Sequence, residues 1–586
     1  MTIQKVYDIL PYQLDHYPLQ DSLAKREDGK SWTYYSTQKL LDLSDQLAQG
    51  LIELGLQKGD KIGIVTSHNQ VEWHIIDRAA SQIGVITVPL YPTISSHEYV
   101  YILNHSEAKY LFVSDAILYK KIKPIRQDIT QLKEIYSIHS IPGLSNWKEL
   151  LPSNPQTDFV ENIKKEISEE DIVTIIYTSG TTGNPKGVML SHKNIISNVL
   201  DCTTMIPMHE QQKALSFLPL CHVFERMLNY TYMYKGIRIY QADGFETIPL
   251  HLMDIKPQYF ATVPRILEKI YEKALTKSKK LPQFQRAIFL WSVRLASSTP
   301  INNKITLFQK IQLAIAYYLV LKKWKLALGG EILAIVSGSA PLNPNLTRLF
   351  NHCDIPVIEG YGLTETSPVL TVNPLLKYKI IPGSVGVTLP SVQIRIADDG
   401  EILAKGPNIM HGYYQDEKST QESFTADGWF KTGDIGHFNQ KNYLIITDRK
   451  KELLKTSGGK YVAPLPIENK LKESPYIEQV VVVGDGKKFV SALIVPNFDI
   501  LKTWCNENKI LYKSKDDIIT NSRVNKMFLD IVRKNNTNFS NVEQIKRIAL
   551  LKEEWTIESG ELTATMKIKR KTIRERYHTI IESFYR

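Results

Sequence analysis

One segment of the chain, Tyr177–Gly187 (YTSGTTGNPKG), has residue types that could hold phosphate groups. Its glycines let backbone N–H groups turn toward phosphate oxygens, while its hydroxyls and its lysine add further donors. The spacing differs from that of the GxxxxGK[ST] P-loop, so the prediction rests on composition and on position after a buried strand. The expected phosphate-binding residues are Thr178, Ser179, Gly180, Thr181, Thr182, Gly183 and Lys186.

The elements that position this loop are predicted from the pattern of apolar residues. Residues 31–115 alternate helix-like amphipathic stretches, such as Leu40–Leu54, with short strand-like runs, such as KIGIV at 61–65. Strands separated by helices of this length indicate parallel βαβ units. The run DIVTIIYT (171–178) is predicted to be a strand that feeds directly into the loop, with a helix following from about Ser191.

Two later parts of the chain have a different character. Residues 265–328 are basic and apolar and predict helices with cationic edges. These helices would either pack on the sheet or lie in the interface of an anionic membrane. From residue 448 onward, short β-like runs alternate with charged helices. We therefore predict an α/β protein with a large multi-layer N-terminal domain (1–448) and a smaller α+β C-terminal domain (449–586).

Further motifs follow the loop in a fixed order. They are GSAP (Gly338–Pro341), EGYGLTETSP (Glu359–Pro368), KTGDIG (Lys431–Gly436), ITDRKKELLKTSGGKYVAPLPIE (Ile446–Glu468) and LTATMKIKR (Leu562–Arg570). Together with the loop, they resemble the signatures of the adenylate-forming superfamily. This superfamily includes acyl-CoA synthetases, luciferases and peptide-synthetase adenylation domains. The resemblance extends over nearly the whole chain.

The resemblance implies an ATP site. Tyr361, between two glycines, is expected to present its ring to adenine. Asp434 is expected to accept both ribose hydroxyls, and Arg449 to reach the same ribose or the phosphate. Other ATP- or AMP-binding positions implied by the motifs are Gly338, Ser339, Ala340, Glu359, Gly360, Gly362 and Thr364.

The resemblance also assigns catalytic roles. Thr364 is expected to bond the forming acyl phosphate, and Glu365, with Thr181, to hold the Mg²⁺ that accompanies ATP. Lys567 is expected to offset charge that builds between the carboxylate and the α-phosphate. Ala564 stands where the long-chain branch of the family often has proline, a departure that affects loop stiffness more than chemistry.

The implied reaction has two steps, acyl-adenylate formation with release of pyrophosphate and then transfer of the acyl group to coenzyme A. The two transition states place charge differently, so one rigid site cannot complement both. In the family a mobile C-terminal domain turns about a hinge, which by position is Lys451. Lys567 serves the first step. The loop Ser457, Gly458 and Gly459 is expected to admit the pantetheine arm of coenzyme A in the second.

The acid is expected to be a long-chain fatty acid. LPLCHVFER (Leu218–Arg226) resembles the acyl-pocket segment of the long-chain branch, and His222 is expected near the carboxylate. A histidine among apolar residues can instead be a satisfied core residue. Three rival interpretations remain: a peptide-synthetase domain, an acyl-AMP ligase that loads a carrier protein, and a non-catalytic lipid binder on the same fold. The last would be expected to have lost Glu365, Asp434 or Lys567, and all are present.

Composition sets the remaining expectations. The chain has 586 residues, is 43% hydrophobic and 23% charged, and has a formal net charge of +11, which alone does not decide between anionic partners and a solvated surface. Four scattered cysteines disfavour a disulfide scaffold or a zinc site. The start lacks a signal-peptide pattern, and no apolar run approaches the ~18 residues of a membrane span. We expect a cytoplasmic protein, with fatty acid and coenzyme A as partners and peripheral contact with the inner face of a membrane. No motif suggests nucleic acid or an obligatory protein partner.

Overall fold

The chain is described here by a computed structural model. The described residues are 3–27, 31–178, 184–301, 305–375, 380–556, 559–563 and 568–586. They form two compact units. Unit 1 comprises Met1–Arg395, Leu403–Lys431 and Gln440–Leu444, and unit 2 comprises Ile396–Ile402, Thr432–Asn439 and Ile445–Arg586. A single cut after residue 448 does not include the two short earlier segments of unit 2.

The loop of interest belongs to a sheet that, among the described residues, has seven strands in the order β18-β8-β7-β4-β3-β5-β6. The strands are β3 (Lys61–Val65), β4 (Ile86–Leu90), β5 (Ala108–Val113), β6 (Glu134–Ser137), β7 (Ile172–Thr178), β8 (Lys186–Ser191) and β18 (Gly412–Tyr413). Strands β3 to β7 pair in parallel, whereas β8 is antiparallel to both neighbours. The predicted βαβ units are confirmed.

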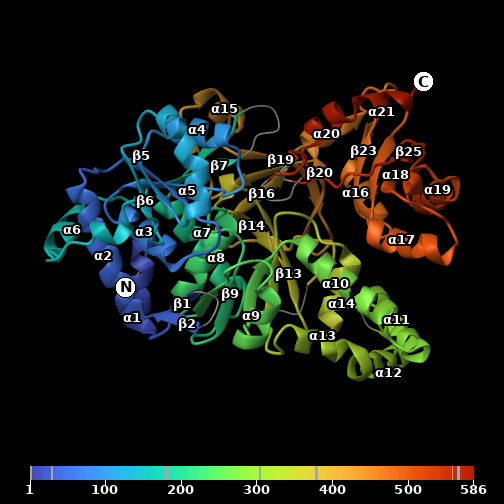
Figure 1. Cartoon of the computed structure of the whole chain (residues 1–586), viewed down its shortest axis with the longest axis horizontal. Coiled ribbons are helices and arrows are strands. Elements are labelled where there is room, and N and C mark those ends of the chain that lie inside the picture. Colours follow the sequence, from blue (N-terminus) through green and yellow to red (C-terminus); the bar gives the residue numbers. More distant parts are fainter. Residues whose placement is uncertain are drawn as a thin grey trace. The chain divides into compact units, whose positions relative to one another are not determined.

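Helices cover this sheet (Figure 1). They include α2 (Thr37–Glu53), α3 (Val71–Ser81), α4 (Ser96–His105), α5 (Ala116–Ile122), α6 (Thr157–Lys164) and α7 (His192–Met205). The side chains between α4, α5 and the strands are a cluster of buried Ile, Leu, Val and Tyr. Strands β3, β4 and β5 are buried almost throughout, which explains their continuous apolar runs.

The second sheet of unit 1 has, within the described residues, nine strands in the order β15-β14-β13-β12-β11-β9-β10-β1-β2. The strands are β1 (Leu23–Glu27), β2 (Ser31–Tyr35), β9 (Lys213–Ser216), β10 (Arg238–Gln241), β11 (Tyr259–Thr262), β12 (Ala334–Ser337), β13 (Val357–Gly362), β14 (Val369–Val372) and β15 (Val387–Thr388). The helices of this part are α1 (Ile9–His16), α8 (Val223–Tyr234), α9 (Ile248–Ile255) and α14 (Pro344–His352).

The basic segment predicted to be helical lies between β11 and β12. It forms α10 (Pro264–Ser278), α11 (Gln283–Ser298), α12 (Leu307–Ala316), a π-helical turn (Tyr317–Leu321) and α13 (Lys322–Ala327). Buried Ser292, Val293 and Ala296 lie on α11, which packs on α14. The helices are therefore attached to the sheet along one side.

Unit 2 is an α+β structure. Most of the sheet β16-β17-β19-β20 belongs to it, as do the hairpin β21-β22 and the sheet β23-β24-β25. These strands are β16 (Gln393–Ile396), β17 (Glu401–Lys405), β19 (Phe430–Phe438), β20 (Leu444–Arg449), β21 (Leu454–Lys455), β22 (Tyr461–Val462), β23 (Ile477–Val483), β24 (Ser491–Pro496) and β25 (Arg547–Leu550). Its helices are α16 (Pro464–Leu471), α17 (Phe498–Glu507), α18 (Lys515–Thr520), α19 (Ser522–Asn536), α20 (Arg570–Arg576) and α21 (His578–Ser583), while α15 (Glu417–Glu422) belongs to unit 1.

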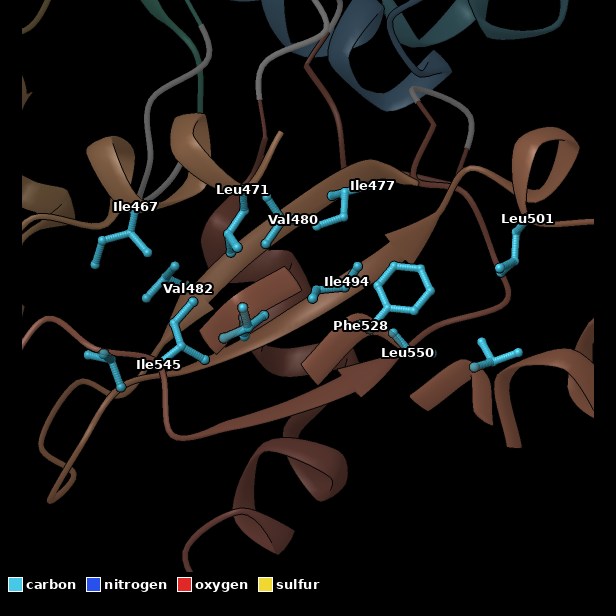
Figure 2. Packing of buried hydrophobic residues seen from close by; sticks show 14 of the residues in the cluster. Ile467, Leu471, Ile477, Val480, Val482, Ile494, Leu501, Phe528, Ile545 and Leu550 are labelled. Atoms are coloured by element: carbon cyan, nitrogen blue, oxygen red, sulfur yellow. The ribbon is translucent and has the colours of Figure 1, made fainter. Parts of the chain in front are cut away.

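The sheet β23-β24-β25 is buried on both faces. Val480, Val482 and Ile494 join one apolar cluster with Phe528 and Ile467 (Figure 2). The alternate positions of the same strands, Val481, Val483, Leu493 and Val495, join a second cluster with residues of α20 and α21. Burial of both faces explains why Val480–Val483 of β23 and Ala492–Val495 of β24 are apolar at every position rather than alternating.

Candidate functional site

The glycine-rich loop connects two antiparallel strands. Thr178, the last residue of β7, pairs with Lys186, the first residue of β8. The helix after the loop begins where predicted, with Ser191 as N-cap of α7, whereas strand β8 between the loop and this helix was not predicted. Ser179, Gly180, Thr181, Thr182 and Gly183 lie outside the described residues.

Lys186 lies in a small cluster at the base of this loop. Its Nζ is 2.5 Å from Ser419 Oγ, 3.9 Å from Asp416 Oδ2 and 4.9 Å from the centroid of the Tyr413 ring. The hydroxyl of Tyr413 in turn donates to Glu365 Oε1 at 3.0 Å. The structure thus brings Lys186 and Glu365, far apart in sequence, to the two sides of one tyrosine.

Tyr413 reaches this place through strand pairing. It lies in β18, which pairs antiparallel with β8 so that Tyr413 is opposite Val188. Burial, and next the charge of Glu365, raises the pKa of Tyr413 well above its usual value, so its hydroxyl stays a donor. Sequence reasoning missed this residue because HGYY carries no recognisable pattern and the pairing is non-local.

The turn that carries Glu365 is held by buried amides. Thr364–Thr366 form one 3₁₀ turn, and Met410 N donates to Glu365 O at 2.9 Å. Asn408 Nδ2 donates to the carbonyls of Thr366 and Val369 at 2.8 and 3.1 Å. The carboxylate of Glu365 is therefore presented from a fixed backbone, with Thr364 half-buried beside it.

Gly362, just before this turn, must be glycine for a steric reason. A Cβ built there would lie 1.7 Å from the carbonyl oxygen of Pro368. No L side chain fits, because that distance is far inside van der Waals contact. Tyr361 is 9% exposed and pairs with Thr371 in β14, and Gly360 pairs with Val372.

The GSAP motif follows β12. Ser337 of β12 pairs in parallel with Glu359 of β13, so Gly338–Ala340 and Gly360–Gly362 run onward from neighbouring strands in the same direction. Gly338 faces the ring of Phe224, which a Cβ would approach to 3.1 Å. Ser339 is partly exposed and Ala340 is exposed.

Glu359 points away from solvent. Its carboxylate accepts from Thr347 Oγ1 at 3.0 Å and from Leu342 N at 3.3 Å, and burial raises the pKa of Glu359 to about 7. These bonds tie β13 to α14 and to the residues that follow GSAP. The carboxylate of this predicted nucleotide-binding residue is thus engaged inside the protein.

His222 is the N-cap of α8. Its Nδ1 accepts from Phe224 N at 3.1 Å, and its ring centroid lies 6.5 Å from that of Tyr91. Because Nδ1 acts as an acceptor, the neutral ring carries its proton on Nε2. The side chain is half-buried at the start of α8.

The segment before His222 is clamped by a buried asparagine. Asn69 Nδ2 donates to Ser216 Oγ at 2.8 Å and to Leu218 O at 2.9 Å, and Asn69 Oδ1 accepts from Leu220 N at 3.3 Å. A cavity of about 30 Å³, lined by Asn69, Phe217, Leu220 and other residues, lies beside this clamp. A volume of this size holds a water molecule rather than an acyl chain.

In unit 2 the structure brings Asp434 and Arg449 together. Asp434 of β19 is 5% exposed, and its Oδ1 lies 2.9 Å from Arg449 Nε of β20. The arginine is 43% exposed, so one side of the pair faces solvent. The two residues that the motifs associate with ribose are thus direct partners.

The predicted hinge residue, Lys451, comes two residues after Arg449. Lys451 lies in a short 3₁₀ turn, Lys450–Glu452, and its side chain is outside the description. Before it, Asp448 is 1% exposed and accepts from Arg449 N at 2.6 Å; burial raises the pKa of Asp448 to about 6. Lys450 pairs with Asp399 at 2.5 Å and with Glu401 at 2.7 Å.

The loop Ser457–Gly459 closes the hairpin β21-β22. Ser457 N donates to Lys487 O at 2.9 Å, and Gly459 N donates to Thr456 O at 2.8 Å. Gly459 has φ +77°, and no atom lies within 4 Å of a Cβ built on Gly458 or Gly459. The turn is exposed and leaves room for a thin ligand at its backbone.

Lys567 lies outside the described residues, but both ends of its segment are fixed. Leu562 and Ile568 form an antiparallel bridge, and Lys569 N donates to Glu561 O at 2.7 Å. Arg570 then binds both carboxylate oxygens of Glu468 at 2.7 Å, and Glu452 at 2.9 Å. The motif alone did not reveal this buried clamp, because Glu468 and Glu452 are over a hundred residues away.

Comparison with known families follows this geometry. Residues 12–414 match the model of the AMP-binding enzymes, and residues 451–586 match that of the AMP-binding enzyme C-terminal domain. The chain belongs to the AMP-binding enzymes. Within the adenylate-forming superfamily, its relatives place it in the long-chain acyl-CoA synthetase branch.

Two relatives illustrate the extent of the similarity. "Long-chain-fatty-acid--CoA ligase FadD15" of Mycobacterium bovis is 34% identical and the alignment covers 94% of this chain and 92% of that protein. "Fatty acyl-CoA synthetase A" of Dictyostelium discoideum is 31% identical, with 99% and 90% covered. The similarity therefore includes both units of this AMP-binding enzyme.

Solved structures support the fold. ATP-bound MatB from Rhodopseudomonas palustris has a TM-score of 0.72 and 21% identity, covering 99% of this chain and 100% of that one. The adenylation domain of a carboxylate reductase from Mycobacterium chelonae has a TM-score of 0.75 and 19% identity, covering 99% and 91%. The predicted α/β fold with a smaller C-terminal domain is confirmed. Over the described residues, no helix is long and apolar enough to span a membrane.

Proposed function

We propose that this AMP-binding enzyme is a long-chain fatty acid:CoA ligase. It converts a fatty acid and ATP to acyl-AMP and pyrophosphate, and then acyl-AMP and coenzyme A to acyl-CoA and AMP. The observation that carries the proposal is the placement of Lys186 and Glu365 around Tyr413, at the base of the glycine-rich loop. The names of relatives that align over more than nine-tenths of both chains support the choice of acid and thiol.

The residues of unit 1 hold the triphosphate. Lys186 and the loop hydroxyls Thr178, Ser179, Thr181 and Thr182 donate to the phosphates, together with the N–H groups of Gly180 and Gly183. The Lys186 ammonium and the hydroxyls together stabilise the negative charge of the triphosphate, which backbone N–H groups alone would stabilise less.

The base and sugar of ATP are bound by the later motifs. Tyr361 presents its ring to adenine, with Gly338–Ala340 and Gly360 forming the backbone on either side. Asp434 accepts the ribose hydroxyls, and its bond to Arg449 orients the carboxylate. Glu359 supports these strands from inside through Thr347 and Leu342.

Mg²⁺ fits this donor set. Among the described residues no group of three or more His, Cys, Asp or Glu is arranged to hold a metal by itself. Mg²⁺ commonly uses one or two protein oxygens plus phosphate oxygens and water, which Glu365, with Thr181, can supply. Tyr413 keeps the Glu365 carboxylate oriented, and Mg²⁺ held there would offset negative charge on the pyrophosphate.

Thr364 and His222 are the residues that we place next to the carboxylate of the fatty acid. We place His222, held at the N-terminus of α8 by its bond from Phe224 N, near the carboxylate or the acyl-adenylate oxygen. Lys567 supplies positive charge as the carboxylate attacks the α-phosphate. The exposed turn Ser457–Gly459 serves the second step, in which the thiolate attacks the acyl-adenylate and AMP leaves. Rotation about the hinge at Lys451 would let unit 2 present Lys567 in the first step and the turn Ser457–Gly459 in the second.

A panel of fatty acids of increasing length tests this proposal. ATP–pyrophosphate exchange should depend on the acid, and AMP release in multiple turnover should depend on coenzyme A. Each added CH₂ that the site buries should contribute about 0.8 kcal/mol, so exchange should rise steeply with length up to the limit of the site.

Two other functions would give different results. AMP release that requires an acyl carrier protein, and ignores coenzyme A, would identify an acyl-AMP ligase. Absence of exchange with every acid would identify a lipid binder. No specific contact favours either over the ligase. We extend the proposal to peripheral contact with a membrane, since long-chain acids partition into bilayers.

A further inference from the structure

The positive charge of the chain is concentrated in one segment. Residues 273–330 contain eleven lysines and arginines and neither aspartate nor glutamate. The formal net charge of the whole chain is +11, so the rest of the chain is balanced. A charge gathered in this way favours one anionic partner at one place, rather than general solubility.

The same segment exposes large apolar side chains. Helices α11 and α12 lie against each other (Figure 1), and the exposed apolar residues of α11, α12 and the following π-helical turn form what we term the α11–α12 face. Four of its residues are strongly exposed: Phe284 (76%), Leu307 (74%), Phe308 (68%) and Tyr318 (74%). The other members are Leu290, Trp291, Ile311, Ile315 and Leu319.

Helical spacing makes this face continuous. Along α12 and the π-helical turn, Phe308, Ile311, Ile315 and Leu319 follow each other at intervals of three and four residues, all exposed. The buried residues described along α12 and the π-helical turn are Ala316, Val320 and Leu321, which are apolar as well. A helix on a solvated surface normally turns polar residues outward, so the outward apolar stripe indicates a partner.

Cations border the apolar residues of this face. Lys310 lies one turn after Leu307 on α12, and Lys322 and Lys323 begin α13 directly after the π-helical turn; all three are exposed. Arg286 lies one turn before Leu290 on α11 and is also exposed. Among the described residues none of these four cations forms an ion pair, whereas Lys325 is engaged with Asp354 at 2.6 Å.

The combination of exposed apolar residues and unpaired cations distinguishes between three kinds of partner. A second copy of this face would bring two unpaired cationic sets together, which like-charge repulsion disfavours. Nucleic acid would use the cations but would leave the aliphatic Leu307, Ile311 and Ile315 unburied. An anionic bilayer accepts both, because apolar side chains enter the acyl boundary while lysines remain at the headgroups.

We propose that the α11–α12 face docks on an anionic lipid bilayer, with Phe284, Phe308 and Ile311 inserted and Arg286, Lys310, Lys322 and Lys323 at the headgroups. The inference rests on the proposed function only in naming the reason for docking, access to a membrane-dissolved fatty acid. Binding itself requires neither ATP nor coenzyme A, so it can be measured apart from activity.

The test is co-sedimentation of the full chain with vesicles, without nucleotide. Vesicles of phosphatidylcholine alone are compared with vesicles of equal parts phosphatidylcholine and phosphatidylglycerol, at low and high salt. We expect binding to the anionic vesicles that weakens as salt rises, because the Debye length shrinks from about 10 Å at 0.1 M to about 3 Å at 1 M. Equal binding to both vesicle types would overturn the electrostatic half of the proposal.

Two triple variants separate the two contributions. Lys310→Gln with Lys322→Gln and Lys323→Gln should lower the partition coefficient on the order of a hundredfold, from about 1 kcal/mol per cation near the surface. Phe284→Ser with Phe308→Ser and Ile311→Ser should lower it roughly tenfold or more. All substituted side chains are exposed, and thermal melting checks that the variants remain folded.

Matched controls use exposed residues elsewhere. Lys502→Gln with Lys526→Gln and Lys534→Gln removes three exposed charges from unit 2. Ile117→Ser with Leu511→Ser removes side chains that are 80% and 95% exposed. Losses as large in these controls as in the face variants would overturn the assignment of this surface. So would unchanged vesicle binding in the face variants.

Activity on a water-soluble, medium-chain acid is measured in parallel. The face variants should keep it, since their substitutions lie outside the predicted nucleotide and acyl residues. An inactive protein that still binds anionic vesicles through this face would overturn the proposed function and leave the surface assignment standing. An active protein without vesicle binding would do the reverse.

Discussion

Tyr413 connects two residues that motif reasoning treats separately. Its ring lies under the Lys186 ammonium at 4.9 Å, and its hydroxyl donates to Glu365 at 3.0 Å. Tyr413→Phe keeps the ring and removes only the donor. A hydrogen bond to a charged group contributes about 1.5–3 kcal/mol, so we expect the rate of ATP–pyrophosphate exchange to fall about tenfold or more.

The neighbouring tyrosine supplies the control. Tyr414 donates to Glu107 at 3.1 Å, a surface carboxylate of unit 1. Tyr414→Phe removes a hydrogen bond of similar length, and it should leave exchange close to that of the wild type. Equal losses in both variants would show that Tyr413 acts only through general stability. Varying Mg²⁺ should show the greater dependence in Tyr413→Phe, because Glu365 loses its orienting partner.

Glu225 is a buried acid with an incomplete set of partners. Its Oε1 accepts from Ser216 Oγ at 2.6 Å and from Asn229 Nδ2 at 3.2 Å, while Oε2 has no partner in the described part of the chain. Burial raises the pKa of Glu225 from 4.5 to about 8. The carboxyl is therefore neutral in the folded protein at pH 7.

This shift predicts a pH dependence of stability. Between pH 4.5 and about 8 the folded protein keeps a proton at Glu225 that the unfolded chain releases, so the free energy of unfolding falls as pH rises. Glu225→Gln cannot titrate and should lose less stability over this range, by a few kcal/mol. Thermal melting of both proteins from pH 5 to 8.5 measures the difference. Exposed Glu553→Gln should leave the profile unchanged, and a parallel profile for Glu225→Gln would contradict the assignment.

At the residue scale, the sequence was informative where chemistry is local. The types and order of residues in the loop, in EGYGLTETSP and in TGD identified candidates that can be named without a structure. Tyr413 and the Asn69 clamp could not be identified, because their roles come from contacts between segments far apart in sequence. Glu359 shows the opposite problem, since a motif position can place its carboxylate inside the protein.

At the element scale, helix α7 was predicted correctly, whereas strand β8, between the loop and this helix, was missed. Lys186–Ser191 is a six-residue strand that returns along β7, and its side chains are mostly buried. Apolar periodicity cannot separate so short a run from the start of a helix. The short apolar runs of β23 and β24, by contrast, were recognised as β-like, and the four consecutive valines of β23 are typical of a strand.

The clamp between α20 and α16 carries a prediction at this scale. Arg570 is 11% exposed and Glu468 3% exposed, and two parallel bonds of 2.7 Å join them. Arg570→Ala leaves a buried carboxylate without its partner and should cost about 3–5 kcal/mol. Arg570→Lys keeps the charge without the bidentate geometry and should cost less. Denaturant unfolding of the full chain, followed by tryptophan emission, provides the measurement.

Arg574→Ala is the matched control for this clamp. Arg574 lies one turn further along α20 and is exposed, so its removal should change stability by no more than about 0.5 kcal/mol. If Arg570→Ala and Arg574→Ala were equally stable, the ion pairs with Glu468 and Glu452 would not contribute to stability. The clamp would then not be what fixes the end of the Lys567 segment.

At the scale of the whole molecule, the two units have distinct tasks in the proposed reaction. The residues for phosphate, adenine and acid belong to unit 1, whereas Asp434, Lys567 and the turn Ser457–Gly459 belong to unit 2. A division of this kind allows two half-reactions with different charge distributions to use different residues of the second unit. The half-reactions should therefore be separable by mutation.

Lys567→Ala is the variant that separates them. It removes the charge required as the carboxylate attacks the α-phosphate, so ATP–pyrophosphate exchange should be abolished. Thioester formation from supplied acyl-adenylate should be spared, because the thiolate attack releases AMP without that charge. Lys571→Ala, at an exposed position on α20, should leave both half-reactions intact. Equal loss of both half-reactions in Lys567→Ala would show that this lysine supports the fold of unit 2 rather than adenylation, and Lys569 would become the next cation to examine.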